Sequence, residues 1–551
     1  MPLRPLLLVA CLLAGASPAV PAQGQPLTEL VPADAVLVAE IPDPAGSFER
    51  LRAGESWRRF HVGPLAAELK KRPEFLMALG ALGMVANSAG TTPERLLADA
   101  AGGGAAFAVL PTEPPQTLLL LRALDPDVAQ DALEAVASFA VSGMSFPDGD
   151  RWRLPMPQGV LERRGDLFLA ASVEAALDRL AESAAGSIAA DTRYREGRKA
   201  VRGSDAFVWL AGDALRTNPI PEKPEDEGGS FLAAPLNEAL RHAEWGAAAL
   251  ELRAGGLALR AALPAPEQVA ETHAPFFPEA RRVRLPRLKD RLGVLVFARD
   301  LGSWWTARHL YMSEKAVANS VEGDSGASTL FGRDYGTEVL KWLEPELRFV
   351  FARNPDPVKV SLEYPAGAVG VRLKKGHPED LPAAFTNAWI GLLTILNFEG
   401  GSMSGDMLLQ DLEALPNGTK LYFARYRAKE GIAPPKHQLS PALSLSPEGE
   451  IWISSSTPLL RAILAAPVEE VDLRGDFLEL ELEGGRPIAA ADRETIVAQR
   501  ALQEGGDVAA AAAWFDRIMA GLELYDGVRL DQRLDGGLLR YELEVTARGP
   551  Q

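Results

Sequence analysis

Cysteine is almost absent from this sequence of 551 residues. The single cysteine, Cys11, lies in an apolar stretch near the N-terminus. If cleavage after Ala22 removes that stretch, the remaining chain has no thiol, which excludes disulfides, thiolate nucleophiles and cysteine-ligated metals. A packed hydrophobic core must therefore stabilise the fold, and a chain of this length can bury one.

Clusters of positive charge are also missing from the sequence as written. The formal net charge is −17, and the lysine pairs, such as the one in "ELKK", stand alone. Phosphate backbones and anionic lipid headgroups attract clustered Lys and Arg. We therefore predict no nucleic-acid partner.

Beyond the N-terminal leader, no apolar run reaches the roughly 20 residues that a membrane-spanning helix needs. The most apolar helical stretch is 388–398, "AWIGLLTILNF". We interpret it as a buried helix, and we predict no transmembrane segment in the mature chain.

Residues 1–22 have the layout of a secretory signal peptide. "MPLRP" carries one positive charge, "LLLVACLLAGAS" is apolar, and "PAVPA" ends in small residues. We expect cleavage after Ala22 and a periplasmic or extracellular location. The alternative is a lipoprotein, because Leu8 to Cys11 matches a lipoprotein cleavage box in which Cys11 becomes the lipidated first residue.

Catalytic motifs are scarce in the mature chain. Gly323-Asp324-Ser325-Gly326 spells the nucleophile motif of chymotrypsin-like proteases, but the nearest upstream histidine, His309, lies in a helical pattern, so we interpret 323–326 as a flexible loop. "AGGGAAF" (101–107) lacks the Gly-Lys-Ser/Thr ending of a phosphate loop, and "EGGSMSGDM" (399–407) lacks the spacing of a nucleophile elbow. We interpret both as turns.

Metal-binding patterns are scarce too. No two histidines stand two, three or four residues apart, and no Asp-x-Asp-x-Asp-Gly run occurs. We interpret 146–152 as a turn and the acidic stretch 221–230 as a mobile loop. The sequence thus predicts no catalytic, cofactor-binding or metal-ligating residue, although a constellation assembled only by folding stays open. The six histidines are His61, His242, His273, His309, His377 and His437.

What the sequence does contain is a repeated pattern. "GDLFLAAS" (165–172) returns as "GEIWISSS" (449–456), with the same order of residue types at all eight positions. Four further segments match in the same order, and together they indicate an internal duplication. The matched pairs are 35–51 with 293–310, 92–110 with 337–353, 118–136 with 369–389, and 251–263 with 531–543.

The repeat sets the predicted domains. The first copy covers 28–263, the second 288–547, and the stretch 264–287, which holds five prolines, is the linker between them. Each copy mixes short strands, hairpins and helices, so we predict an α+β fold with a largely antiparallel sheet. The expected helices include 92–101, 126–139, 174–183, 458–466, 491–504 and 508–520.

Two adjacent tryptophans, Trp304 and Trp305, form the most suggestive aromatic pattern. In the first copy the matching positions hold Phe48 and Glu49. We favour two anchors in the core over a platform for carbohydrate or peptide, because large aromatic side chains usually serve packing.

Four segments carry a resemblance to a known family. "LVPADAVLVAEIPDP", "SWRRF", "TPERLLADAAGGGAAFAVL" and "GRDYGTEVLKWL" resemble an exported bacterial family known only as a domain of unknown function. The resemblance implies export and a duplicated architecture, and it implies no activity.

Two functional hypotheses remain. The first is a non-enzymatic scaffold or binding protein of the cell envelope, whose partner is an envelope protein, a peptide or a polysaccharide. The alternative is an exported hydrolase whose catalytic residues are dispersed in the sequence. An inactive relic of a duplicated enzyme has the same sequence features as the first hypothesis.

Overall fold

The chain folds into two compact units, each treated below on its own. Unit 1 comprises Met1–Ile220, Leu240–Pro264 and Arg540–Gln551, and unit 2 comprises Pro221–Ala239 and Ala265–Leu539. The computed structural model describes residues 26–140, 151–153, 159–180, 186–203, 205–216, 223, 227–265, 272–279, 281–353, 365–403, 407–426, 440–473, 475–481, 493–503 and 505–547. The predicted signal peptide, with Cys11, lies outside these residues. So do residues 146–150 of the turn predicted over 146–152, whereas Arg151 and Trp152 belong to a strand.

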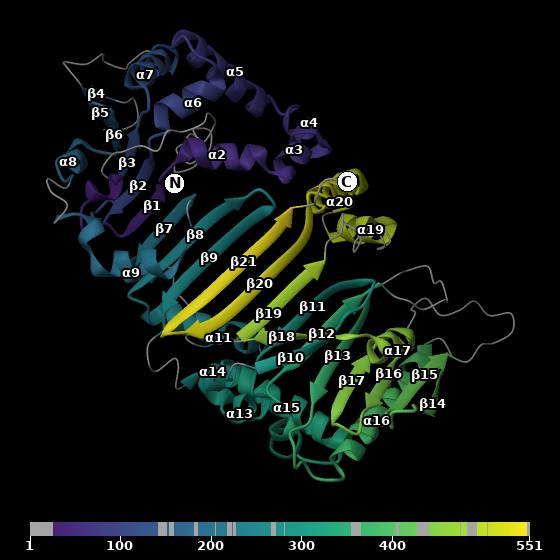
Figure 1. Ribbon diagram of the computed structural model, residues 1–551. Helices are drawn as coiled ribbons and strands as arrows, with labels where there is room; N and C mark the ends of the chain where they lie inside the picture. Colours follow the sequence, from purple (N-terminus) through teal and green to yellow (C-terminus); the bar gives the residue numbers. More distant parts are fainter. Residues whose placement is uncertain are drawn as a thin grey trace. The chain divides into compact units, whose positions relative to one another are not determined.

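Unit 1 is built on an antiparallel sheet (Figure 1). In hydrogen-bonding order its strands are β4 (Arg151–Arg153), β5 (Val160–Arg164), β6 (Leu167–Ala171), β3 (Gln116–Arg122), β2 (Ala105–Leu110), β1 (Leu37–Ile41), β7 (Ala206–Ala211), β8 (Trp245–Arg253) and β9 (Gly256–Pro264). The last strand of the chain, β21 (Leu538–Ala547), pairs with β9.

Helices cover both faces of the unit 1 sheet. Because successive side chains of a strand point to opposite faces, Leu120 and Leu121 of β3 face different layers. On one face, Tyr194 contacts the rings of Phe207 and Trp209, and on the other Leu121 and Phe168 pack together. The helices are η1 (Leu27–Glu29), α2 (Pro44–Ala53), α3 (Glu55–Val62), α4 (Pro64–Leu69), α5 (Pro73–Ser88), α6 (Pro93–Ala101), α7 (Pro126–Ala140), α8 (Glu174–Leu177), η3 (Ile188–Ala190), α9 (Thr192–Ala200) and α10 (Gly212–Leu215).

The strands of unit 2 are also antiparallel. Its strands run in the order β14 (Leu408–Ala414), β15 (Lys420–Tyr426), β16 (Ala442–Leu445), β17 (Glu450–Ser454), β13 (Ala366–Arg372), β12 (Leu347–Ala352), β11 (Arg291–Phe297), β19 (Gly475–Glu481) and β20 (Tyr525–Asp535). The helices are α11 (Glu227–His242), which begins in unit 2 and ends in unit 1, η4 (Ala274–Phe276), α13 (Leu301–Thr306), α14 (Arg308–Tyr311), α15 (Glu314–Phe331), the π-helix η5 (Tyr335–Val339), η6 (Leu340–Trp342), α16 (Leu381–Met403), α17 (Thr457–Ala465), α19 (Arg493–Gln503) and α20 (Val508–Leu522).

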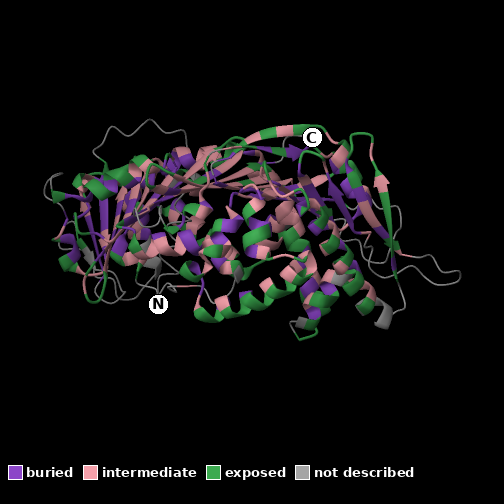
Figure 2. Ribbon diagram, turned by 90° about the horizontal axis from the view of Figure 1, so that it is seen from below, coloured by how far each residue is buried: buried purple, intermediate pink, exposed green. Residues whose placement is uncertain are grey.

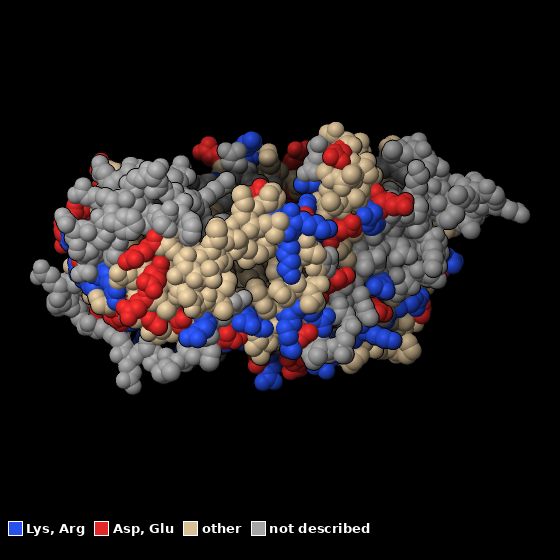
Figure 3. Space-filling view, turned by 90° about the horizontal axis from the view of Figure 1, so that it is seen from above, with Lys and Arg blue, Asp and Glu red and all other residues tan. Residues whose placement is uncertain are grey.

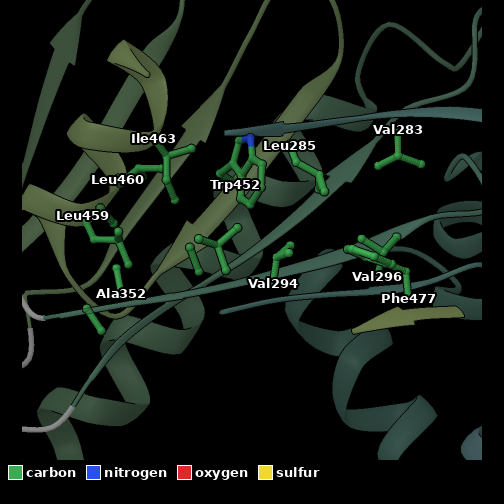
Figure 4. Close-up of a cluster of buried hydrophobic side chains, with 14 of the residues drawn as sticks. Val283, Leu285, Val294, Val296, Ala352, Trp452, Leu459, Leu460, Ile463 and Phe477 are labelled. Atoms are coloured by element: carbon green, nitrogen blue, oxygen red, sulfur yellow. The ribbon is translucent and has the colours of Figure 1, made fainter. Parts of the chain in front are cut away.

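The core of unit 2 has two layers, one on each face of its sheet. The first contains Val294 and Val296 of β11 together with Trp452, Leu460 and neighbours under α17 (Figure 4). The second lies beneath α16, where Phe385 and others meet the opposite face of the same strands. Buried residues are concentrated in the strands and on the inward sides of helices (Figure 2). Each fully buried large apolar side chain contributes about 1.5–3 kcal/mol to the free energy of unfolding.

The strands of the two units follow the same order. Reading from β5, unit 1 runs β5-β6-β3-β2-β1-β7-β8, and reading from β16, unit 2 runs β16-β17-β13-β12-β11-β19-β20. Every pairing is antiparallel in both. Each pair of matched sequence segments includes strands at the same place in the two orders. The predicted α+β class with a large antiparallel sheet is confirmed.

The repeated phrase matches with a shift of one residue. Ser172 donates its backbone N–H to the Thr117 carbonyl, and its hydroxyl accepts from the Thr117 N–H at 3.0 Å. Ser455, rather than Ser456, makes the same two contacts with Gly367. The difference lies in the hairpin turns. Gly165 and Gly449 both adopt positive φ, but Asp166 stands between Gly165 and β6, whereas β17 begins directly after Gly449.

The predicted linker is wrong for part of its length. Residues 281–286 form strand β10 (Arg281–Pro286), which pairs along its whole length with β18 (Val468–Leu473). Val283 and Leu285 are fully buried against the first core layer of unit 2. Proline is tolerated here because Pro286 is at the end of a two-stranded ribbon, where a missing N–H leaves no central ladder bond unmade.

The predicted copy boundaries also differ from the units. Residues 221–239 lie within the sequence of the first copy but belong to unit 2, and 540–551 lie at the end of the second copy but belong to unit 1. Part of the predicted acidic loop, 227–230, is the first turn of α11. Ser230 is buried there and donates to the carbonyl of Tyr311, which favours ordered helix over a mobile loop.

Most of the expected helices are present. They appear as α6, α7, α17, α19 and α20 with bounds shifted by one or two residues, whereas the helix expected over 174–183 ends at Leu177. Thr92 caps α6 as expected, its hydroxyl accepting from the Arg95 N–H.

Candidate functional site

The two tryptophans are positioned by a helix that starts directly after β11. Asp300 caps α13 by accepting a hydrogen bond from the Ser303 N–H at 3.0 Å. Adjacent residues of a helix point about 100° apart, so Trp304 and Trp305 meet different neighbours. Trp304 packs edge-to-face on Phe231 of α11, and Trp305 packs edge-to-face on Tyr335.

Both tryptophans are packing residues. Trp304 is only 6% exposed and belongs to a buried cluster with Phe276 and Tyr311. Trp305 is half-buried, with the guanidinium of Arg308 4.6 Å from its ring centroid. The prediction that the pair anchors the core is confirmed.

A fully buried arginine, Arg299, lies beside this aromatic cluster. Its guanidinium carbon is 4.7 Å from the ring of Phe276, and two further rings, Phe231 and Phe297, lie within 6 Å. Both terminal nitrogens bond Asp476 at 2.5 Å. The arginine therefore joins α11, the segment around η4, β11 and β19 at one point of unit 2.

Nε and Nη1 of Arg299 also bond backbone carbonyls. Nε donates to the Phe231 carbonyl at 3.3 Å, and Nη1 donates to the carbonyls of Phe276 and Ala298. Burial raises the pKa of Asp476, while Arg299 and the Ala298 N–H act in the opposite direction. With its donors engaged by the protein itself, this cluster can fix segments together but presents no guanidinium edge to a substrate.

Unit 1 also has an ion pair with a buried aspartate, beside strand β7. Asp205, next to β7, is almost fully buried, accepts from the Leu252 N–H at 2.7 Å and pairs with Arg50 of α2 at 2.7 Å. In unit 2, Asp476 lies at the start of β19, the strand that matches β7 in the shared strand order. In both units a buried aspartate at the start of this strand thus pairs with an arginine from the segment that follows β1 or β11.

A second charged cluster surrounds Arg348 of β12. Arg348 is fully buried, donates to Glu450 at 2.7 Å, and lies 4.7 Å from the ring centroid of Trp452. Burial works to raise the pKa of Glu450, but Arg348 and the Trp452 indole N–H hold it below its usual value. Nη2 of Arg348 has no hydrogen-bond partner among the described residues.

The protease-like motif has the wrong structure for catalysis. Residues 323–326 lie inside the 18-residue helix α15, and not in the flexible loop that we predicted. Ser313 caps this helix, and Ala316 and Ser320 are buried on its inward side, so tertiary packing overrides the turn-forming composition. A nucleophilic serine in that motif needs a loop conformation that exposes it beside a base.

The other motifs are structural where they are described. "AGGGAAF" ends α6 and enters β2, with Gly104 at φ +132°, as expected of a turn. Residues 399–403 continue α16, so the predicted turn there is wrong. No group of three or more His, Cys, Asp or Glu in the described part of the chain could hold a metal ion.

The histidines are dispersed. His273 is buried and lies 5.0 Å, between ring centroids, from Tyr311, whose pKa burial raises to about 12. His61 is exposed and stacks on Trp57, and His377 bonds the Pro378 carbonyl. His242 ends α11, His309 lies in α14, and His437 falls outside the described residues.

Sequence reasoning missed the exposed apolar side chains of two helices. On α5, Leu76 is 53% and Met77 is 67% exposed. On α16, Phe398 is 81% exposed and Ile395 is nearly half exposed. The interpretation of 388–398 as a buried helix is therefore wrong for its outer side.

The pattern of α16 explains that error. Its inward side repeats every three or four residues, through Phe385, Trp389 and Leu393, and these side chains are buried. Within the described residues, α16 is the one helix whose length and composition would let it cross a membrane, a test that core helices also pass. The signal for exposure is that apolar residues occupy the outward positions as well.

The comparisons with known proteins add no relative. No family model matches the chain, no curated protein matches it, and no solved structure matches it.

Proposed function

We propose that this chain is an exported, non-enzymatic scaffold or binding protein of the cell envelope. The observation that carries the proposal is that two helices each expose apolar side chains to solvent: α5 in unit 1 and α16 in unit 2. Monomeric proteins rarely leave contiguous apolar patches in water unless the patch contacts a partner. The partner classes that we consider are an envelope protein, a peptide, a polysaccharide or the envelope's lipid.

The charged clusters support the same proposal. Arg299 with Asp476, and Arg348 with Glu450, are engaged within the fold, and their positions beside strand cores fit a structural role. A hydrolase would need titratable groups that face a substrate.

We also propose that the two units derive from a tandem duplication. The shared strand order, the matching serine contacts of Ser172 and Ser455, and the buried aspartates Asp205 and Asp476 support this origin. A duplicated scaffold gives two sets of outward helices that can diverge in the surface they contact.

Site-specific photo-crosslinking in the native envelope tests the function. A photoreactive residue placed at Met77 or Phe398 should give discrete adducts with envelope components, and one placed at Glu196, an exposed position on α9, should give few. The proposal fails if the three positions react alike and the purified mature protein turns over a substrate from a hydrolase panel.

A further inference from the structure

Helix α5 is apolar on two sides. Its inward side, including Leu82, Val85 and Ala86, packs against α6 and α7. Its outward side carries Leu76, Met77, Leu79 and Met84, each more than 40% exposed. A surface helix needs one apolar side to join a core, so the fold does not account for the second.

Positive charge is concentrated at the N-terminal end of this helix. Residues 50–72 hold seven Lys and Arg and two Asp and Glu, in a chain whose net charge is −17. The five arginines of this stretch form ion pairs with nearby carboxylates, so the cations that stay available are the two lysines. Lys70, Lys71 and Arg72 are exposed immediately before α5, and neither lysine forms an ion pair with any residue of the described chain. Figure 3 shows an uncharged area over α5 that has Lys and Arg side chains along one side and Asp and Glu side chains along the other.

From this combination we propose that α3, α4 and α5 bind the surface of an anionic lipid bilayer. Lys70 and Lys71 contact headgroup phosphates, and Leu76 and Met77 enter the boundary between headgroups and acyl chains. Val62, 85% exposed at the end of α3, adds a further apolar contact. The inference rests on the proposed function, because it names the partner of the α5 surface.

The geometry fits a bilayer surface better than a protein groove. At 100° per residue, the outward positions from Leu79 to Met77 cover an arc of about 160°, whereas a helix that docks in a groove presents a narrower stripe. The 16 residues of α5 extend about 24 Å, less than the roughly 30 Å hydrocarbon core, so the helix lies on the bilayer and does not cross it.

The negative net charge does not prevent this contact. At physiological ionic strength charges further away than about 8 Å are largely screened, so the bilayer responds to the cluster next to α5 rather than to the whole chain. From the sequence, we interpret the lysine pair as isolated. The structure adds that α3 packs beside α4, and that Arg58 of α3 is exposed but paired with Glu55 at 2.9 Å.

Vesicle co-sedimentation tests the proposal with the mature chain, residues 23–551. Vesicles of phosphatidylglycerol and phosphatidylcholine should bind the protein, vesicles of phosphatidylcholine alone should bind it far less, and added salt should weaken binding. Lys70→Gln with Lys71→Gln should weaken binding about ten- to thirtyfold, because each cation near an anionic surface contributes about a factor of five. Leu76→Gln with Met77→Gln should also abolish most of it.

A matched control uses two exposed lysines of unit 2. Lys289→Gln with Lys375→Gln makes the same charge change and should leave binding unchanged. Circular dichroism of each variant checks that the fold is retained, which is expected because all the substituted side chains except Leu76 and Met77 are polar and all are exposed.

Equal binding to neutral and anionic vesicles, or equal loss in the control variant, would overturn the lipid proposal. So would absence of vesicle binding combined with a discrete protein adduct at position 77 in the envelope, and that result would leave the proposed function standing. If the protein does not bind vesicles and a photoreactive residue at position 77 gives no envelope adduct, both the lipid proposal and the role assigned to α5 fail.

Discussion

At the scale of single residues, buried charge decides how unit 2 is held together. Arg299 makes hydrogen bonds to Asp476 and to three backbone carbonyls, from segments far apart in the sequence. No sequence pattern predicts this cluster. An arginine after a strand is common, and only folding brings an aspartate and three aromatic rings around Arg299. The tryptophan anchors could be predicted, since size alone favours burial.

Removal of one partner of this ion pair should be severely destabilising. Arg299→Met leaves the Asp476 carboxylate buried without its cation, and we expect the free energy of unfolding of unit 2 to fall by about 3–5 kcal/mol. Urea unfolding followed by tryptophan fluorescence measures the loss. The double variant Arg299→Met/Asp476→Leu should lose less than the sum of the two single variants, and strict additivity would contradict a direct coupling.

A glycine of the protease-like motif gives a prediction of increased stability. Gly323 lies inside α15, and a Cβ added there would meet nothing within 4 Å. Gly323→Ala should therefore stabilise the protein by about 0.5–1 kcal/mol, because alanine loses less backbone entropy in a helix. Thermal unfolding checks this, with Gly332→Ala as the control. Gly332 adopts φ +65° at the helix end, so its substitution should destabilise.

At the scale of elements, strand and helix existence could be predicted but their environment could not. Hairpins with glycine turns and capped helices such as α6 depend on local sequence, so the sequence predicted them and the structure contains them. The outward side of α16 and the strand β10 were missed for a different reason. Burial depends on which element packs alongside, and proline content alone does not exclude a strand in a two-stranded ribbon.

A ladder of ion pairs joins three neighbouring strands of unit 1. Arg260 of β9 bonds Glu542 of β21 at 2.6 Å and Glu251 of β8 at 2.7 Å, and Arg253 bonds Glu251 and Glu544. Hydrogen bonds from Arg253 and Arg260 lower the pKa of Glu251 to about 2.

This pKa predicts how stability depends on pH. Because the folded protein binds the Glu251 proton more weakly than the unfolded chain, the stabilising contribution is present above the unfolded value of about 4.3 and is lost as pH falls towards 2. Thermal unfolding from pH 6 to pH 2.5 should show a smaller decrease in Tm for Glu251→Gln than for the wild type. Glu196→Gln should follow the wild type, and an unchanged slope for Glu251→Gln would contradict the assignment.

At the scale of the whole molecule, the repeated sequence pattern predicted matching elements correctly in order but not in detail. The phrase at 165–172 corresponds to its partner with a one-residue offset, which brings Leu177 and Leu460, both fully buried, into register. The exchange of segments between the units could not be predicted, because contacts of α11 with Trp304 depend on tertiary packing and leave no local signature.

The shared strand order is the central claim, and paired cysteines test it most directly because the mature chain is expected to contain no others. Leu119 lies opposite Ala170 between β3 and β6, and Val369 lies opposite Ile453 between β13 and β17. Partners directly opposite in antiparallel strands are about 4.5–5.5 Å apart between Cα atoms, within the range of a disulfide.

The measurement is the extent of intramolecular disulfide formation in two double variants, Leu119→Cys/Ala170→Cys and Val369→Cys/Ile453→Cys. The account predicts that both pairs close on mild oxidation, whereas Leu119→Cys/Ala171→Cys, with side chains on opposite faces of the sheet, stays reduced. Closure of only one of the two equivalent pairs, or equal closure of the opposite-face control, would contradict a common strand order in the two units.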